Sequence, residues 1–211
     1  MDSIKIAKEL LRIKAVFLRP NDPFTWASGI KSPIYCDNRL ILSDPEARKT
    51  VEEAIAKTVK EKFPEAEVLM GTSTAGIAHA AIAGWLLNMP MGYVRGGNKD
   101  HGRGNRIEGK LEPGNKVVVI EDLISTGGSC IEVVDALREA GADVLGIVSI
   151  FTYGMEKGKQ RLKDADVMNY SLTNFDTLCK AAVEEGYITE NEELKLKTFM
   201  ANPSDPSWQS I

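Results

Sequence analysis

Between residues 67 and 151 the sequence alternates short runs of β-branched residues with longer amphipathic runs. The short runs are almost continuously apolar, which is typical of strands buried on both faces, whereas apolar residues in the longer runs recur at helical spacing. Strands that alternate with helices form a parallel sheet covered on both faces. The pattern therefore predicts an α/β fold with a mostly parallel central sheet flanked by helices. The predicted strands are 67–70, 91–95, 116–120 and 143–151, and the predicted helices are 75–88 and 128–140.

The N-terminal 43 residues differ from this alternation and are predicted to form a small hood or flap. Residues 3–14 have one apolar face and predict a helix, whereas prolines and glycines interrupt 20–43. Asp44 and Pro45 match an N-cap followed by proline at the first helical position. We therefore predict a single domain over 1–211, with the hood formed mainly by 1–43 and the core by about 44–211. Short strands are expected at 24–26 and 34–37, and a helix at 45–63.

Two further segments complete the predicted domain. Residues 96–113 carry six glycines and prolines among charged residues, and this irregularity predicts a long loop. Beyond residue 155 we predict two helices and a short strand near 167–172. His79 lies on the helix 75–88, where we expect a packed or surface side chain rather than a catalytic one.

Composition restricts the classes of partner. The formal net charge is −4, so there is no electrostatic reason to expect nucleic acid or an anionic membrane as a partner. No stretch approaches the roughly 18 apolar residues of a membrane span. The cysteines (Cys36, Cys130, Cys179) are widely spaced, so neither a disulfide framework nor a zinc site is expected. A cytoplasmic protein fits this composition best.

The segment 116–129 has the pattern of a phosphate-binding turn. A buried strand ends in Glu121 and Asp122, and the residues after it lead into an amphipathic helix. Ligands of open α/β sheets bind outside the carboxyl ends of the strands. Here Ser125, Thr126 and Ser129 offer hydroxyls, while the glycines 127 and 128 let main-chain N–H groups approach a phosphate at the helix N-terminus. The alternative is an ordinary turn into a helix.

The two acids make the prediction more specific. Carboxylates so close to a phosphate would repel the ligand unless they accept hydrogen bonds from its hydroxyls, as a ribose diol would allow. The same negative charge favours a cation bound between ligand oxygens, and Mg²⁺ is the usual ion where phosphates meet few carboxylates. We therefore predict a phosphorylated ribose, with Mg²⁺ held mainly by the ligand and close to Asp122.

Residues 117–129 resemble the donor-binding motif of type I phosphoribosyltransferases, which transfer ribose 5-phosphate from phosphoribosyl pyrophosphate (PRPP) to a nitrogen nucleophile. Three other stretches, 24–35, 71–76 and 93–95 with the loop 99–102, are similar to the orotate phosphoribosyltransferase family. Together these stretches span most of the chain. The resemblance implies a type I phosphoribosyltransferase fold, transfer of ribose 5-phosphate from PRPP to orotate, and a homodimer. In that dimer the 96–110 loop would reach the partner's active site.

The resemblance also implies roles for individual residues. Lys99 and His101 would be catalytic, on a loop whose glycines allow it to open and close over the leaving pyrophosphate. PRPP would bind Arg95, Lys99, His101, Glu121, Asp122, Leu123, Ile124, Ser125, Thr126, Gly127, Gly128 and Ser129. The pyrophosphate loop would be Thr72, Ser73, Thr74, Ala75 and Gly76. Orotate would bind Ser28, Gly29, Lys31, Tyr35, Arg39 and Ser125.

The chain departs from the family pattern at three places. It has Gly96 and Gly97 where many relatives carry basic residues, Ala27 where some carry lysine, and Tyr153 where some carry arginine. These differences leave open how the orotate carboxylate is held, and Lys31 and Arg39 are the predicted substitutes. Two other functions stay open: transfer to a purine or another pyrimidine base, and a PRPP-sensing regulator that binds nucleic acid.

Overall fold

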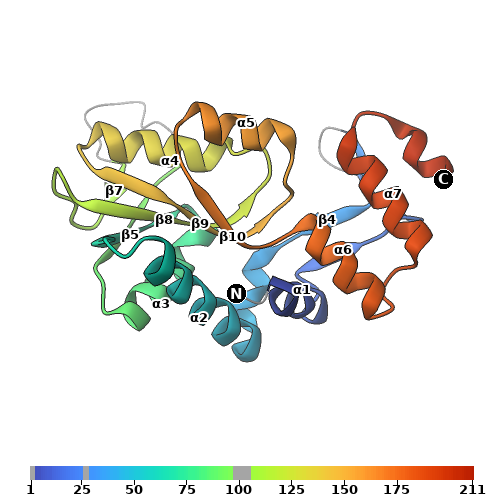
Figure 1. Ribbon diagram of the computed structural model, residues 1–211, viewed down its shortest axis with the longest axis horizontal. Helices are drawn as coiled ribbons and strands as arrows, with labels where there is room; N and C mark the ends of the chain where they lie inside the picture. The colour runs from blue at the N-terminus through green and yellow to red at the C-terminus, as the bar shows by residue number, and fades with distance from the viewer. Residues whose placement is uncertain (1–2, 26–28, 97–105) are drawn as a thin grey trace.

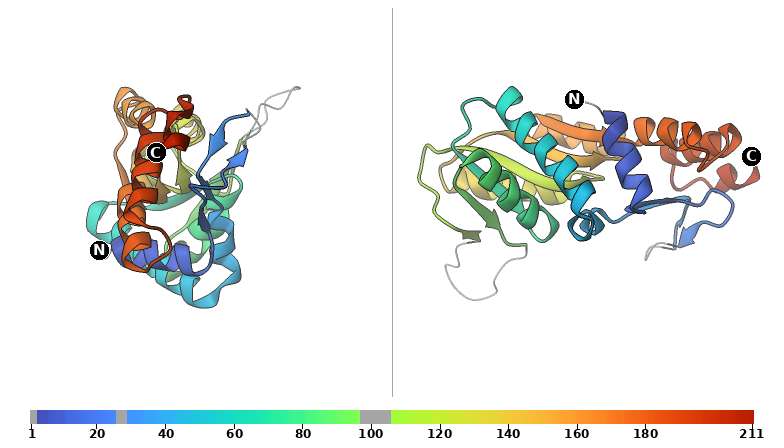
Figure 2. Two further views of the ribbon diagram at one scale, coloured as in Figure 1. Left: turned by 90° about the vertical axis from the view of Figure 1, so that its right-hand side faces the viewer. Right: turned by 90° about the horizontal axis from the view of Figure 1, so that it is seen from below.

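A computed structural model describes residues 3–25, 29–96 and 106–211 of the chain. In this part of the chain a core built on one sheet and a smaller hood lie end to end (Figures 1 and 2). None of the helices in the described ranges is both long and apolar enough to cross a membrane.

The core sheet has six strands in the described residues, in the order β10-β9-β8-β5-β6-β7. All neighbouring pairs are parallel except β6 and β7, which are antiparallel. The fold class predicted from the sequence is therefore confirmed. The strands are β5 (Val68–Thr72), β6 (Met91–Val94), β7 (Ile107–Glu108), β8 (Lys116–Ile124), β9 (Asp143–Thr152) and β10 (Asn169–Asn174).

Helices cover both faces of this sheet, as Figure 1 shows. Along β8, Val118 and Ile120 belong to the apolar cluster on one face, and Val117 and Val119 to the cluster on the other. This division follows from the strand period of two residues. One face carries α2 (Pro45–Lys62) and α3 (Ala75–Leu87), and the other carries α4 (Gly128–Glu139) and α5 (Glu156–Asp164).

The hood contains residues from both ends of the chain. Asn21 of the N-terminal segment bonds Glu192 at 2.7 Å and Lys195 at 2.8 Å. The C-terminal helix 175–184 packs on the N-terminal helix 3–12 and also contacts β10 of the core (Figure 1). The hood elements are α1 (Ser3–Arg12), β1 (Val16–Leu18), β2 (Phe24–Thr25), β3 (Lys31–Ser32), β4 (Ile34–Cys36), η1 (Asn38–Ser43), α6 (Phe175–Glu184), α7 (Glu190–Ala201) and η2 (Pro206–Ser210).

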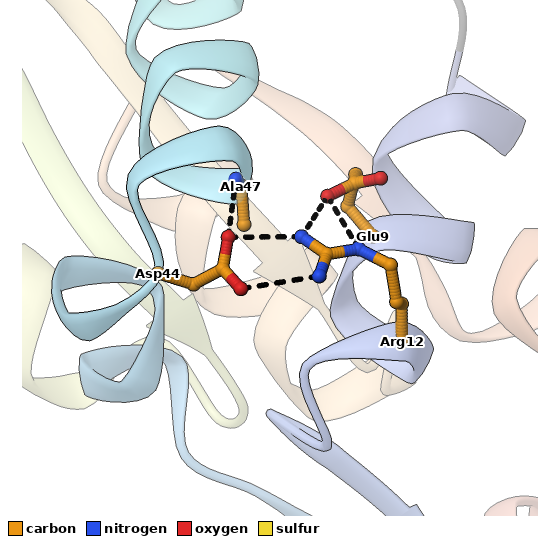
Figure 3. A network of polar contacts seen from close by, with 4 residues as sticks. All are labelled: Glu9, Arg12, Asp44 and Ala47. Atoms are coloured by element: carbon orange, nitrogen blue, oxygen red, sulfur yellow. Dashed lines mark hydrogen bonds and ion pairs between the residues drawn. The ribbon is translucent and has the colours of Figure 1, made fainter.

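The start of α2 joins hood to core. The Asp44 side chain accepts a hydrogen bond from the Ala47 amide, so it is the N-cap predicted from the sequence. The same carboxylate receives two hydrogen bonds from Arg12 of α1, which also bonds Glu9 (Figure 3). These bonds to Arg12 lower the pKa of Asp44 to about 2. Helix α1 is thereby tied to the first turn of α2.

Two predictions about secondary structure are wrong. The segment predicted as a long loop contains β7, which pairs with β6. Beyond residue 155 there are three α-helices in the described residues, rather than the two predicted. Gly186, with φ of 71°, follows the end of α6, and a capping box of Thr189 and Glu192 starts α7 only a few residues later. This region was predicted as one helical stretch, but the short interruption divides it into α6 and α7.

Candidate active site

The two predicted phosphate-binding turns lie side by side. One follows β5 and leads into α3, and the other follows β8 and leads into α4. Strands β5 and β8 are parallel neighbours, with Gly71 opposite Ile120, so both turns emerge at the same edge of the sheet. The structure thus brings together two segments that are about 50 residues apart in sequence.

The turn after β8 leaves the N-terminus of α4 without a side-chain cap. Gly127 is the N-cap of α4, adopts φ of 76°, and supplies no side-chain cap. Ser125 and Ser129 are exposed at this turn, while Thr126 and Gly128 are half-buried. The positive end of α4 and these hydroxyls can therefore contact an anion. Leu123 and Ile124, which were also predicted to contact PRPP, are the last two residues of β8.

The turn after β5 is held by a hydrogen bond to the neighbouring strand and by a close approach at Gly76. The Ser73 hydroxyl donates to the Val94 carbonyl of the neighbouring strand β6. Thr74 is the N-cap of α3 but makes no side-chain cap bond, and Ala75 begins the helix. A Cβ atom on Gly76 would lie 2.4 Å from the Ile120 carbonyl oxygen. Glycine at this position therefore lets α3 approach β8 closely.

Glu121 connects the two turns. Its carboxyl oxygen Oε1 accepts a hydrogen bond from the Thr72 hydroxyl at 2.7 Å and from the Asp122 amide at 2.9 Å. The side chain is buried, and burial together with the neighbouring Asp122 carboxyl raises the pKa of Glu121 to about 8. Near neutral pH Glu121 is therefore mostly protonated, which reduces its repulsion of a phosphorylated ligand.

Asp122 is half-buried and contacts the hood. Its carbonyl oxygen accepts a hydrogen bond of 2.7 Å from the side-chain amide of Asn38, the first residue of η1. The thiol of Cys36 in turn donates to the Asn38 side-chain oxygen at 3.3 Å. The end of the donor strand β8 and the hood are thus in direct contact.

The predicted pyrophosphate-end residues are only partly described. Arg95 follows β6 at the same sheet edge, and its guanidinium forms a 3.2 Å ion pair with Glu108 of β7. Lys99 and His101 lie outside the described residues. Their catalytic roles and the contact of the 96–110 loop with a partner stay predictions.

The predicted orotate residues lie in the hood, and their side chains bond locally. Lys31 of β3 donates to the Thr25 hydroxyl at 2.7 Å, and Arg39 forms two hydrogen bonds of 2.6 and 2.8 Å with Asp37. Tyr35 of β4 is 42% exposed. Gly29 adopts φ of 85° just before β3, while Ser28 lies outside the described residues.

Three residues near the site were given no functional role by the sequence analysis. Asn38 had no role assigned, although it contacts Asp122. Arg161 of α5 places a guanidinium nitrogen 3.3 Å from the Thr126 carbonyl oxygen, so a cation lies beside the turn after β8. Tyr153 follows β9 and is half-buried near Cys36 and Tyr35, and loss of solvent around its hydroxyl raises its pKa. These contacts join segments that are far apart in the sequence, so no local sequence pattern predicts them.

His79 is a packed residue, as expected. It is fully buried, and its Nδ1 atom lies 2.6 Å from a carboxylate oxygen of Glu52 on α2. The pair joins α2 to α3 behind the turn after β5.

The fold and these two turns define a class of transferase. The chain belongs to the phosphoribosyltransferase family, since the model of the phosphoribosyl transferase domain matches residues 39–179. Within that family the chain is closely similar in sequence to proteins named orotate phosphoribosyltransferase. The chain is 58% identical over 204 residues to the orotate phosphoribosyltransferase of Bacillus cytotoxicus, a match that covers 97% of each chain.

Solved structures agree with this assignment. The orotate phosphoribosyltransferase from Aeropyrum pernix superposes with a TM-score of 0.75 at 27% identity, over 87% of this chain and 99% of that one. UMP synthase from Leishmania donovani gives a TM-score of 0.81 at 27% identity over 95% of this chain. The present chain spans 42% of that longer protein.

Proposed function

We propose that this protein transfers ribose 5-phosphate from PRPP to orotate, giving orotidine 5′-monophosphate and pyrophosphate, a step of pyrimidine biosynthesis. The observation that supports it most directly is the hydrogen bond from Thr72 to Glu121, because it holds two anion-binding turns side by side at one sheet edge. A ligand with phosphates at both ends of a ribose has the form that such a pair of turns requires. The named relatives supply the choice of orotate.

The donor is proposed to lie across both turns. Its 5-phosphate would contact the uncapped N-terminus of α4 at 125–129, and its pyrophosphate would contact 72–76 and Arg95. The ribose hydroxyls would then face Glu121 and Asp122, which lie between the two turns. A mostly protonated Glu121 can both donate and accept hydrogen bonds, so it suits a diol near several phosphates.

Catalysis is proposed to depend on charge and position. Cleavage at ribose C1 leaves positive charge on the sugar and negative charge on the departing pyrophosphate, so fixed cations near that group lower the barrier. Arg95 lies at the correct edge, and Lys99 and His101 are proposed to add to it from the 96–110 loop. Orotate would be positioned by the hood, from Gly29, Lys31, Tyr35 and Arg39 together with Ser28 and Ser125.

Mg²⁺ is proposed as the cofactor. The carboxyl groups of Glu121 and Asp122 lie close enough to raise the pKa of Glu121, so this point of the site favours added positive charge. Among the described residues there is no group of three potential ligands that could enclose a metal ion. The residues therefore fit an ion held mainly by donor oxygens, with Asp122 as the nearest protein carboxylate. Bound there, Mg²⁺ would offset charge on the pyrophosphate.

We also propose a cytoplasmic homodimer in which the 96–110 loop of one subunit completes the site of the other. The family resemblance supports the exchange, and the glycines of that loop would allow it to open and close. The free thiols of Cys36, Cys130 and Cys179 suit a reducing compartment.

A direct assay tests the proposed activity. The purified protein is mixed with orotate, PRPP and Mg²⁺, and the loss of orotate absorbance is followed. We expect turnover with orotate and none with adenine, hypoxanthine or uracil. Turnover of a purine base but not of orotate would refute orotate as the acceptor. If no base is turned over, the proposal that this protein is a phosphoribosyltransferase is refuted. Omitting Mg²⁺ should abolish activity.

A further inference from the structure

Strand β8 extends beyond its neighbour β5. Its pairing with β5 ends at Ile120, whereas its pairing with β9 continues to Ile124. Main-chain polar groups that follow Ile120 on the β5 side therefore need partners other than a strand. These groups belong to the residues proposed to bind the ribose.

Side chains supply those partners at Asp122. Its amide N–H donates to Glu121, and its carbonyl accepts from the Nδ2 atom of Asn38. The two bonds are 2.9 and 2.7 Å long, so the main chain of Asp122 is held at both of its polar groups. The direction of the Asp122 side chain depends on this main chain.

Asn38 is itself fixed in the hood. It is 1% exposed, and its side-chain oxygen accepts a bond from the Cys36 thiol. The side-chain amide of Asn38 therefore cannot turn to water if the bond to Asp122 is lost, and an unpaired buried amide is costly. Asn38 also lies within the hood segment proposed to bind the acceptor, directly before Arg39 and 84 residues away from Asp122 in sequence.

A continuous series of hydrogen bonds results. It runs from Thr72 in the pyrophosphate loop through Glu121 and Asp122 to Asn38 and then Cys36 in the hood. We propose that Asn38 is a positioning residue of the reaction, which fixes Asp122 against the ribose and sets the distance between the donor strand and the acceptor hood. This inference rests on the proposed function.

The replacement of Asn38 by leucine tests it, because leucine has nearly the same shape but cannot donate to the Asp122 carbonyl. Binding of PRPP with Mg²⁺ is measured by calorimetry in the absence of orotate, below the melting temperature of each variant. We expect Asn38→Leu to bind PRPP about tenfold more weakly, the effect of one lost, partly buried hydrogen bond. In steady-state assays the KM for PRPP should rise more than the KM for orotate.

Two further variants complete the design. Thr58→Val removes a buried side-chain bond to the Ala54 carbonyl on α2, away from the site, and should bind PRPP like wild type. Asn38→Ser, whose hydroxyl is shorter than the amide, should weaken PRPP binding in the same direction, and it carries the test if the leucine variant does not fold.

The outcomes separate the two proposals. PRPP binding by both Asn38 variants at the wild-type affinity would overturn the positioning role, as would a rise in the KM for orotate alone. A wild-type protein that neither binds PRPP nor consumes orotate would instead refute the proposed function.

Discussion

At the scale of single residues, Glu121 and Asp122 of β8 differ in burial and in bonding partners, although they are adjacent in the sequence. Both were predicted to hold ribose hydroxyls. In the structure the Glu121 carboxyl is buried against Thr72, whereas Asp122 is half-buried and tied to the hood through its main chain. The sequence placed both acids near the carboxyl end of the correct strand, although β8 continues past them to Ile124. The direction of each side chain depends on β5 and η1, which lie far away in the chain.

The raised pKa of Glu121 predicts a pH-dependent stability. The folded protein keeps this carboxyl protonated up to a pKa of about 8, whereas the ordinary value is 4.5. Between these values the folded state binds more protons than the unfolded state, so the free energy of unfolding falls as the pH rises from 4.5 to about 8. Glu121→Gln keeps the neutral shape and lacks this titration. We expect wild type to lose stability relative to Glu121→Gln across that range in urea unfolding.

Glu67→Gln provides the control. Hydrogen bonds from Lys116 and Asn115 lower the pKa of Glu67, so its contribution to stability is lost only as the pH falls below the ordinary value. The difference between Glu67→Gln and wild type should therefore stay constant from pH 5 to pH 8. A constant difference for Glu121→Gln as well would contradict the titration of a buried carboxyl.

At the scale of elements, the strands and helices with strong periodicity were predictable. The sequence located β5, β6, β8 and β9 and their helices, because buried parallel strands and amphipathic helices have distinct periods. Strand β7 was missed because two residues carry no period, and it exists only through its pairing with β6. The contact of Asn38 with β8 was missed for the same physical reason, since it depends on tertiary packing.

The close approach of α3 to β8 predicts a sensitive glycine. In Gly76→Ala the new methyl group would lie 2.4 Å from the Ile120 carbonyl oxygen and 2.5 Å from the Thr72 hydroxyl. Because the nearer atom is main chain, the helix must shift, and we expect a loss of about 1–3 kcal/mol of stability, typical of overpacking. PRPP binding should weaken as well.

Thermal unfolding and calorimetry measure both effects. Gly96→Ala is the control for stability, since no described atom lies within 4 Å of the position of its added Cβ. Equal melting temperatures for Gly76→Ala and wild type would show that α3 does not need this contact.

At the scale of the whole molecule, the proposed exchange of loops makes a prediction about mixtures. Lys99→Ala should lower kcat roughly 10²- to 10³-fold, as expected when one preorganised donor is removed. Asp122→Asn should be similarly impaired in binding the ribose. If the loop acts on the partner, a mixed dimer of these two variants has one site with both defects and one site with neither.

Equal amounts of the two variants are unfolded and refolded together, and activity is measured. Random pairing should restore about a quarter of the wild-type activity. The same variants refolded separately and then assayed in one cuvette give the background. Recovery no greater than this background would mean that each loop serves its own subunit or that no such dimer forms.

The hood draws on both ends of the described chain, and this has a consequence for biosynthesis. Trp208 is 1% exposed and packs against Phe199, in the same lobe as α1. A ribosome makes the donor half, with its sheet and both turns, before it makes α6, α7 and η2. A nascent chain could therefore bind PRPP while its acceptor lobe is still unfinished, and the sugar donor could assist folding before the enzyme can use it.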